Sequence, residues 1–141
     1  MDRLSTTAIG MLFGVLLGCA SVDEEKVDHT VRVRNVGKTR IVNMTWSYGS
    51  LGDRTLRFVG RGADSVTMPM TIPEVLVVGW TTERDGERHS AVVPIRSVVS
   101  PLQLSGRIVS IEVDDIDLGV YLVERIQLDE RRVLTFPPRT Y

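Results

Sequence analysis

The stretch VVGWTTERDGERHSAVVPI, residues 77–95, indicates a β-hairpin and points to the fold class of the chain. Its first strand, expected at residues 74–82, is apolar on both faces at its middle, which is typical of a strand at the centre of a sheet. Asp85 and Gly86 follow, and both residue types tolerate the positive φ angles of a tight hairpin turn. Beyond the turn, apolar residues alternate with polar ones, and Pro94 is expected to end or bulge the returning strand.

Alternation with a period of two residues recurs along most of the chain. The other expected strands are residues 29–36, 40–48, 54–59, 65–72, 107–113 and 118–128, with 133–136 as a short addition. No long window after Cys19 has a helical period of 3.6 residues. Short strands separated by turns predict an all-β protein: a single immunoglobulin-like β-sandwich, or a small barrel, of about seven to eight strands.

The alternation also predicts which large side chains are buried. In the strand at 40–48, four side chains share the face expected in the core: Val42, Met44, Trp46 and Tyr48. Trp80 belongs to the strand expected at the centre of a sheet and is also predicted as core. Pro69 lies on the outward face of its strand and suits a sheet edge, where its missing N–H disrupts no ladder.

Composition limits the function classes. The chain has 141 residues, enough for one domain, with 17 basic and 18 acidic residues and a formal net charge of -1. This balance gives no basic surface for nucleic acid, so no nucleic-acid partner is expected. The single cysteine excludes an internal disulfide, and with two histidines it leaves no thiolate cluster for zinc.

The N-terminal segment carries a sorting signal. Residues 8–17 (AIGMLFGVLL) are apolar but too short to span a hydrocarbon core, which needs about 20 residues. A short apolar run ending at small residues is typical of a secretory signal. The following Leu16-Leu17-Gly18-Cys19 resembles the lipobox of bacterial lipoproteins, which implies cleavage before Cys19 and attachment of a diacylglycerol to its thiol. The alternative is a buried cysteine at the end of a first helix.

The resemblance also implies a location and a domain organisation. In enteric-type lipoproteins an aspartate after the lipidated cysteine favours the inner membrane, and here that position is Ala20. The resemblance therefore implies a lipid anchor in the outer membrane, on the periplasmic face. We expect residues 1–18 to be the signal peptide, 19–28 the lipidated cysteine and a polar tether, and 29–141 the β-sandwich.

Chemical motifs are scarce. The chain contains no G-x-S-x-G elbow and no glycine-rich phosphate loop. His29 and His89 are far apart in the sequence, and His89 is expected to be a solvated strand residue beside the hairpin turn. Three aspartates, Asp114, Asp115 and Asp117, lack the spacing of a calcium loop and are interpreted as a solvated turn. We therefore expect no catalytic residues, no metal and no cofactor.

The most highly charged turn is the candidate partner-binding site. Residues Arg84, Asp85, Glu87 and Arg88 carry dense charge of both signs within one hairpin. The turn is either simply a solvated loop, or a rim that orients a charged partner, since arginine can make bidentate contacts. If the protein works by binding, we expect contact at a strand edge or charged loop rather than in a deep pocket.

The stretch at 77–95 resembles small uncharacterised proteobacterial lipoproteins with one β-sandwich domain, some of which are toxin-immunity proteins. This resemblance implies a non-catalytic protein-binding module whose partner is another envelope or secreted protein. The most specific version of this binding function is neutralisation of a secreted effector. The alternative is an accessory lipoprotein of a secretion or envelope assembly, and an envelope enzyme is less favoured.

Overall fold

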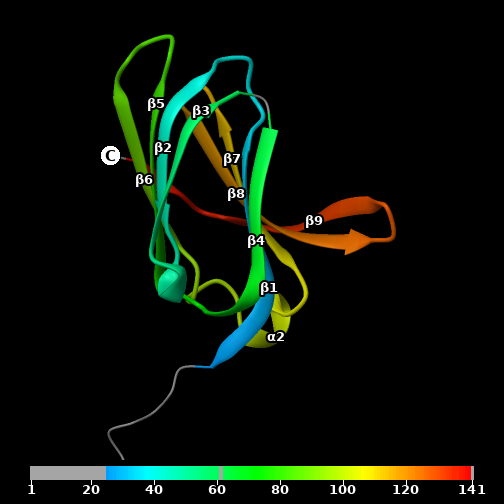
Figure 1. The fold of residues 1–141 in the computed structure, drawn as a ribbon. Helices are drawn as coiled ribbons and strands as arrows, with labels where there is room; N and C mark the ends of the chain where they lie inside the picture. The colour runs from blue at the N-terminus through cyan, green and yellow to red at the C-terminus, as the bar shows by residue number, and fades with distance from the viewer. Residues whose placement is uncertain (1–24, 61, 141) are drawn as a thin grey trace, which may run out of the picture.

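The protein is a two-layer β-sandwich. The computed structural model describes residues 25–60 and 62–140, which form two five-stranded sheets packed face to face (Figure 1). The prediction of an all-β sandwich is confirmed. The predicted signal peptide, Cys19 and the first part of the tether lie outside the described residues.

Sheet A and sheet B each contain strands from distant parts of the chain. Sheet A has the order β4 (Gly62–Thr71), β1 (Lys26–Asn35), β7 (Ile108–Asp114), β8 (Asp117–Ile126) and β9 (Asp129–Phe136). Sheet B has the order β10 (Arg139–Thr140), β6 (Arg88–Pro94), β5 (Val75–Thr82), β2 (Ile41–Ser47) and β3 (Asp53–Val59). Two short helices, η2 (Gly49–Leu51) and α2 (Pro101–Leu104), lie in the connections. Strands β1 and β7 pair in parallel, and the other pairs are antiparallel.

Several strand boundaries differ from prediction. The described residues contain ten strands rather than about seven to eight, because the short addition expected at 133–136 is part of a full strand, β9, and a further short strand, β10, follows it. The strand expected at 118–128 ends at Ile126, and β9 begins at Asp129 after a two-residue turn in which Gln127 has φ 59°. Strand β1 begins at Lys26, inside the expected tether, because Val27 pairs with Met70 and is buried.

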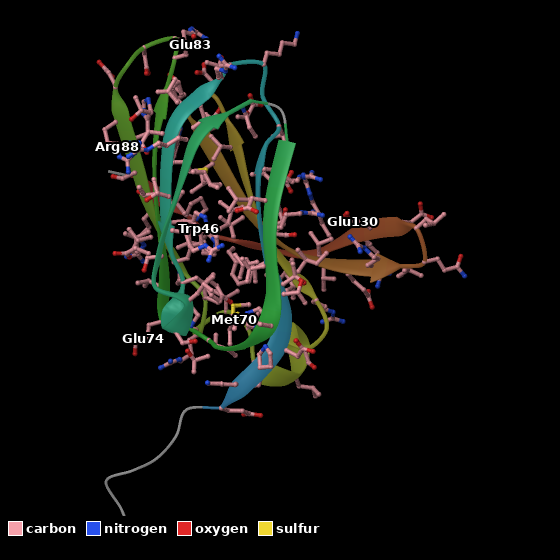
Figure 2. All side chains as sticks on the ribbon, in the orientation of Figure 1. Trp46, Met70, Glu74, Glu83, Arg88 and Glu130 are labelled. Atoms are coloured by element: carbon pink, nitrogen blue, oxygen red, sulfur yellow. The ribbon has the colours of Figure 1, made fainter. Side chains whose placement is uncertain are left out.

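The core fills the space between the sheets. The predicted core residues Met44, Trp46 and Trp80 are buried, and Figure 2 shows Trp46 between the sheets. The prediction for Val42 is wrong: a β-bulge between Ile41 and Asn43 breaks the alternation, so Ile41 is buried and Val42 is only half-buried.

The predicted sheet positions are confirmed. Strand β5 is central in sheet B, and Pro69 lies in β4, which is an edge strand of sheet A. The outward valines of β5, Val75 and Val77, are nevertheless exposed, because no other part of the described residues forms a layer over the outer face of sheet B. The apolar residues on both faces of β5 therefore correctly indicated a central strand, although only one face of that strand is buried.

A buried polar pair joins the two sheets within the core. His29 of sheet A and Tyr48, which follows β2 of sheet B, are both buried. The His29 Nδ1–H donates to the carbonyl of Val27 at 2.7 Å, so the neutral ring accepts at Nε2 from the Tyr48 hydroxyl, 2.9 Å away. Burial lowers the pKa of His29 below its ordinary value of 6.5 and raises the pKa of Tyr48.

Tyr48→Phe is expected to lower the free energy of unfolding by about 1–3 kcal/mol, because it leaves the buried Nε2 of His29 without a partner. Below pH 6.5, the ordinary His29 value, wild-type stability should fall, because the unfolded chain binds a proton that the folded ring does not. Urea unfolding between about pH 8 and about pH 5 measures both effects. If a His29→Gln control shows the same acid-side decline as wild type, the decline does not come from His29.

Candidate functional site

The charged turns selected from the sequence meet at one end of the sandwich, the loop end. The β5–β6 loop, residues 83–87, and the β7–β8 turn both lie there (Figure 1). Arg84 forms an ion pair with Asp115, with 2.8 Å between Nη1 and Oδ2. The indole Nε1–H of Trp80 donates to the backbone carbonyl of Asp115 at 2.8 Å. The structure therefore joins the predicted rim and the acidic turn into one surface that also caps the core.

Asp85 organises the β5–β6 loop. Its Oδ1 accepts hydrogen bonds from the Thr82 hydroxyl, 2.7 Å away, and from the Glu87 backbone N–H, 2.9 Å away. The Thr82 bond, the Glu87 bond and the contact with His89 lower the pKa of Asp85 to about 2. Gly86 has φ 66°, but Asp85 is not among the residues with positive φ. The loop is therefore fixed by side-chain hydrogen bonds as well as by its glycine.

His89 is not the solvated residue that was predicted. Its Nε2 lies 2.9 Å from Asp85 Oδ2, and its ring packs on Trp80 with 5.6 Å between centroids. A histidine–carboxylate pair could serve acid–base chemistry if a nucleophile stood at the other ring nitrogen. The nearby Thr82 hydroxyl donates to Asp85 instead and is buried. The arrangement therefore orders the loop and activates no nucleophile among these groups.

Arg88 lies flat against the outer face of sheet B. Its guanidinium crosses over Gly79 and bonds to the hydroxyl of Thr45, and a Cβ on Gly79 would come 2.5 Å from Arg88 Nη2. Of the four predicted partner-binding residues, Arg84, Asp85 and Arg88 have side chains bonded within the fold. Arg84 and Glu87 remain exposed at the loop end.

An arginine cluster on the outer face of sheet A was missed by sequence reasoning. It comprises three arginines, two glutamates and a serine from three strands: Arg32, Arg34, Ser110, Glu112, Glu130 and Arg132. Arg32 Nη1 donates to both carboxylate oxygens of Glu130, at 2.8 and 2.7 Å, while its Nε and Nη2 donate to Ser110 Oγ. Figure 2 shows Glu130 on the projecting β8–β9 hairpin, to the right of β4.

The second half of the cluster centres on Glu112. Its Oε1 accepts from Arg34 at 3.0 Å and from Arg132 at 3.3 Å, and Glu112 is buried. Arg132 also stacks on the Tyr121 ring, with its Cζ 3.8 Å from the centroid. Gly119 leaves the space that this ring occupies, because a Cβ there would collide with it. Buried charges are tolerated only when paired, so this network joins β9 to β1 and β7 across the outer face of sheet A.

The hairpin that the cluster holds extends beyond the sandwich. We call residues 124–133 the arm: the end of β8, the turn and the start of β9, which project from the two layers in Figure 1. At its base the register passes from Leu122–Leu134 to Val123–Arg132, so Val133 is the extra residue of a β-bulge. Bulges bend and twist a hairpin, which explains why the arm leaves the plane of sheet A.

The arm exposes apolar side chains. Leu128, at the turn, is 99% exposed, and Ile126 and Val133 are 50% and 40% exposed. Ile126 lies on the same face of β8 as the buried Leu122, because side chains two and four residues apart share a face. This face of β8 therefore continues into the arm, where sheet B no longer covers it, with the ion-paired Glu124 between Leu122 and Ile126.

Glu130→Gln is expected to loosen the arm, because Arg32 then loses its charged partner. Arg32 is only 9% exposed, and its contact with Glu130 lowers the pKa of that carboxyl. The free energy of unfolding should fall by about 1 kcal/mol, and amide hydrogen exchange in the arm should become several-fold faster. Asp129→Asn, at the neighbouring exposed position, is the matched control. Equal exchange in both variants would show that the Arg32–Glu130 contact does not hold the arm.

Clustered metal ligands and long apolar helices are both lacking in the part of the chain that the structure describes. That part contains no group of three or more His, Cys, Asp or Glu side chains placed to hold a metal ion. Within residues 25–60 and 62–140, no helix is long and apolar enough to cross a membrane.

Comparisons with known proteins give few matches. No protein-family model matches the chain, and no curated protein matches it. A solved NMR structure of a protein from Eubacterium rectale is 18% identical and has a TM-score of 0.44. The match covers 77% of this chain and 100% of that one.

Proposed function

We propose that the protein is a lipoprotein anchored through Cys19 on the periplasmic face of the outer membrane, and that it acts there as a non-catalytic protein-binding module. The observation that supports binding is the exposure of apolar side chains on the arm, above all Leu128 at its turn. The proposed anchor rests on the sequence Leu16-Leu17-Gly18-Cys19.

The arm fits a protein partner better than a lipid or a small molecule. Within residues 25–60 and 62–140, strand β9 is the last strand of sheet A and has β8 as its only sheet neighbour, so its outer edge can pair with a strand of another protein. Charges of both signs, including the Arg131–Glu124 ion pair, surround the apolar side chains. We propose that the partner adds an extended strand along β9 and receives Leu128 in an apolar pocket.

Cys19→Ala is expected to abolish acylation and cleavage at this site, because the thiol is the group that would carry the diacylglycerol. Metabolic labelling of cells with a fatty-acid analogue tests this, with wild type as the reference. Equal label on the wild-type and variant proteins would contradict the lipid anchor. The proposal of protein binding would not be affected, because it rests on the exposed side chains of the arm.

The partner can be located by photocrosslinking in cells of the producing organism. A photoreactive residue is placed at Leu128, and matched exposed positions serve as references: Ile116 at the loop end and Val77 on the outer face of sheet B. We expect a discrete crosslinked protein from position 128 alone. Crosslinking from position 116 alone would overturn the arm as the contact surface and assign it to the loop end, where Arg84 and Glu87 are exposed.

The identity of the crosslinked protein separates the two forms of this function. A secreted effector of the same organism would support immunity, and deletion of this protein should then make cells sensitive to that effector. A subunit of a secretion or envelope complex would support an assembly role. Immunity is the form we propose, because residues 77–95 resemble small uncharacterised proteobacterial lipoproteins, some of which are toxin-immunity proteins.

A further inference from the structure

A second highly exposed leucine lies at the opposite end from the loop end. Leu102 in α2 is 88% exposed, whereas Leu104 in the same helix is buried in the core. Residues two apart on a helix face nearly opposite directions, so the anchoring of Leu104 directs Leu102 outward. The Ser100 hydroxyl and the Gln103 side chain form a capping box that fixes the first turn. The capped helix α2 therefore holds Leu102 in a fixed, solvent-exposed position.

This helix is bonded to the first strand of the described chain. The Gly106 backbone N–H, just after α2, donates to the carbonyl of Asp28 at 2.8 Å. A surface hollow of about 460 Å³ is lined from both sides, by Glu25 and Lys26 and by Leu102 among others. Figure 1 shows α2 beside the start of β1, at the far end of the sandwich from the β5–β6 loop.

The distance to the proposed anchor limits how the sandwich can sit on a membrane. Glu25 is the sixth residue after Cys19, and six residues reach at most about 20–22 Å. Strand β1 runs from the α2 end toward the loop end over ten residues, about 30 Å. The anchor can therefore hold the α2 end at the bilayer, and with the sandwich upright the loop end then lies about 30 Å further away.

We propose that the α2 end is a membrane-docking surface on which Leu102 inserts into the lipid layer. This inference rests on the proposed anchor at Cys19. The charged side chains around this end are of both signs, with Glu25, Asp28 and Glu74 against Lys26, Arg96 and Arg107. Docking is therefore apolar and needs no anionic lipid. It turns the loop end away from the membrane.

The test uses the full lipidated protein in phosphatidylethanolamine vesicles, with and without phosphatidylglycerol. Because lipidation consumes the Cys19 thiol, Leu102→Cys supplies a single free thiol for an environment-sensitive fluorophore. Ile116→Cys, another exposed apolar position at the loop end, is the matched control. We expect quenchers on the lipid acyl chains to at least halve the emission at position 102, equally in both lipid mixtures, and to leave position 116 unchanged.

Two results would overturn the inference and can be told apart. Protein that floats with the vesicles but shows no quenching at position 102, or equal quenching at both positions, leaves the anchor intact and contradicts docking at α2. Protein that does not float with the vesicles contradicts the anchor and the docking together. Each labelled variant is compared with wild type by far-UV circular dichroism, which reports its strand content.

Discussion

Trp80→Ala is expected to lower the free energy of unfolding by about 3–5 kcal/mol, a large part of the ~5–15 kcal/mol typical of a single domain. Trp80 is fully buried in the central strand of sheet B. Its Nε1–H donates to the Asp115 carbonyl in the β7–β8 turn of sheet A, at 2.8 Å. The substitution therefore opens a cavity and removes a bond between the two sheets at the loop end.

Two controls separate these contributions. Trp80→Phe keeps most of the apolar volume and removes the indole N–H, so its cost should be about 1 kcal/mol. Val77→Thr, on the exposed face of the same strand, should change stability by less than about 0.5 kcal/mol. Urea unfolding can be followed by the fluorescence of the remaining Trp46. If Trp80→Ala costs no more than Val77→Thr, Trp80 does not support the sandwich in the way its burial indicates.

The hairpin at residues 77–95 shows what local sequence could predict. Alternation, the Asp85-Gly86 pair and Pro94 placed β5, the turn and the end of β6 correctly. The role of Asp85 could not be predicted in the same way. Its hydrogen bond with Thr82 joins residues close in sequence. Its contact with His89 depends on how the His89 ring packs against Trp80.

The arm was missed because its turn has no characteristic residues. Gln127 adopts a positive φ of 59°, but neither glutamine nor leucine is typical of such a turn. The predicted strand at 118–128 therefore ran through the turn. Helix α2 was missed for a different reason. It is too short for a helical period, although Ser100 and Gln103 have the spacing of a capping box.

The arginine cluster could not have been found from local pattern. Arg32 and Arg34 alternate along β1 with the buried Val31 and Val33, which is typical of the outward face of a half-buried strand. Burial of Arg32 depends on Glu130, which is 98 residues away in sequence and reaches it only because the arm bends over sheet A. Charges brought together by topology of this kind carry no signal in a single sequence.

Leu128→Asp is expected to raise the dissociation constant for the crosslinked partner at least about 30-fold, the equivalent of a hot-spot loss of ~2 kcal/mol. A carboxylate would have to be desolvated in the pocket that receives the leucine. Stability should be unchanged within about 0.5 kcal/mol, because Leu128 is 99% exposed and supports no core contact.

The central claim is that the arm is the surface through which this protein binds another protein. Its most direct test is the equilibrium affinity of the purified crosslinked partner for three forms of the protein: wild type, Leu128→Asp and Ile116→Asp. Our account predicts a large loss of affinity for the Leu128 variant and wild-type affinity for the Ile116 variant, at equal folded content. Wild-type affinity in the Leu128 variant, or a loss confined to the Ile116 variant, would contradict it.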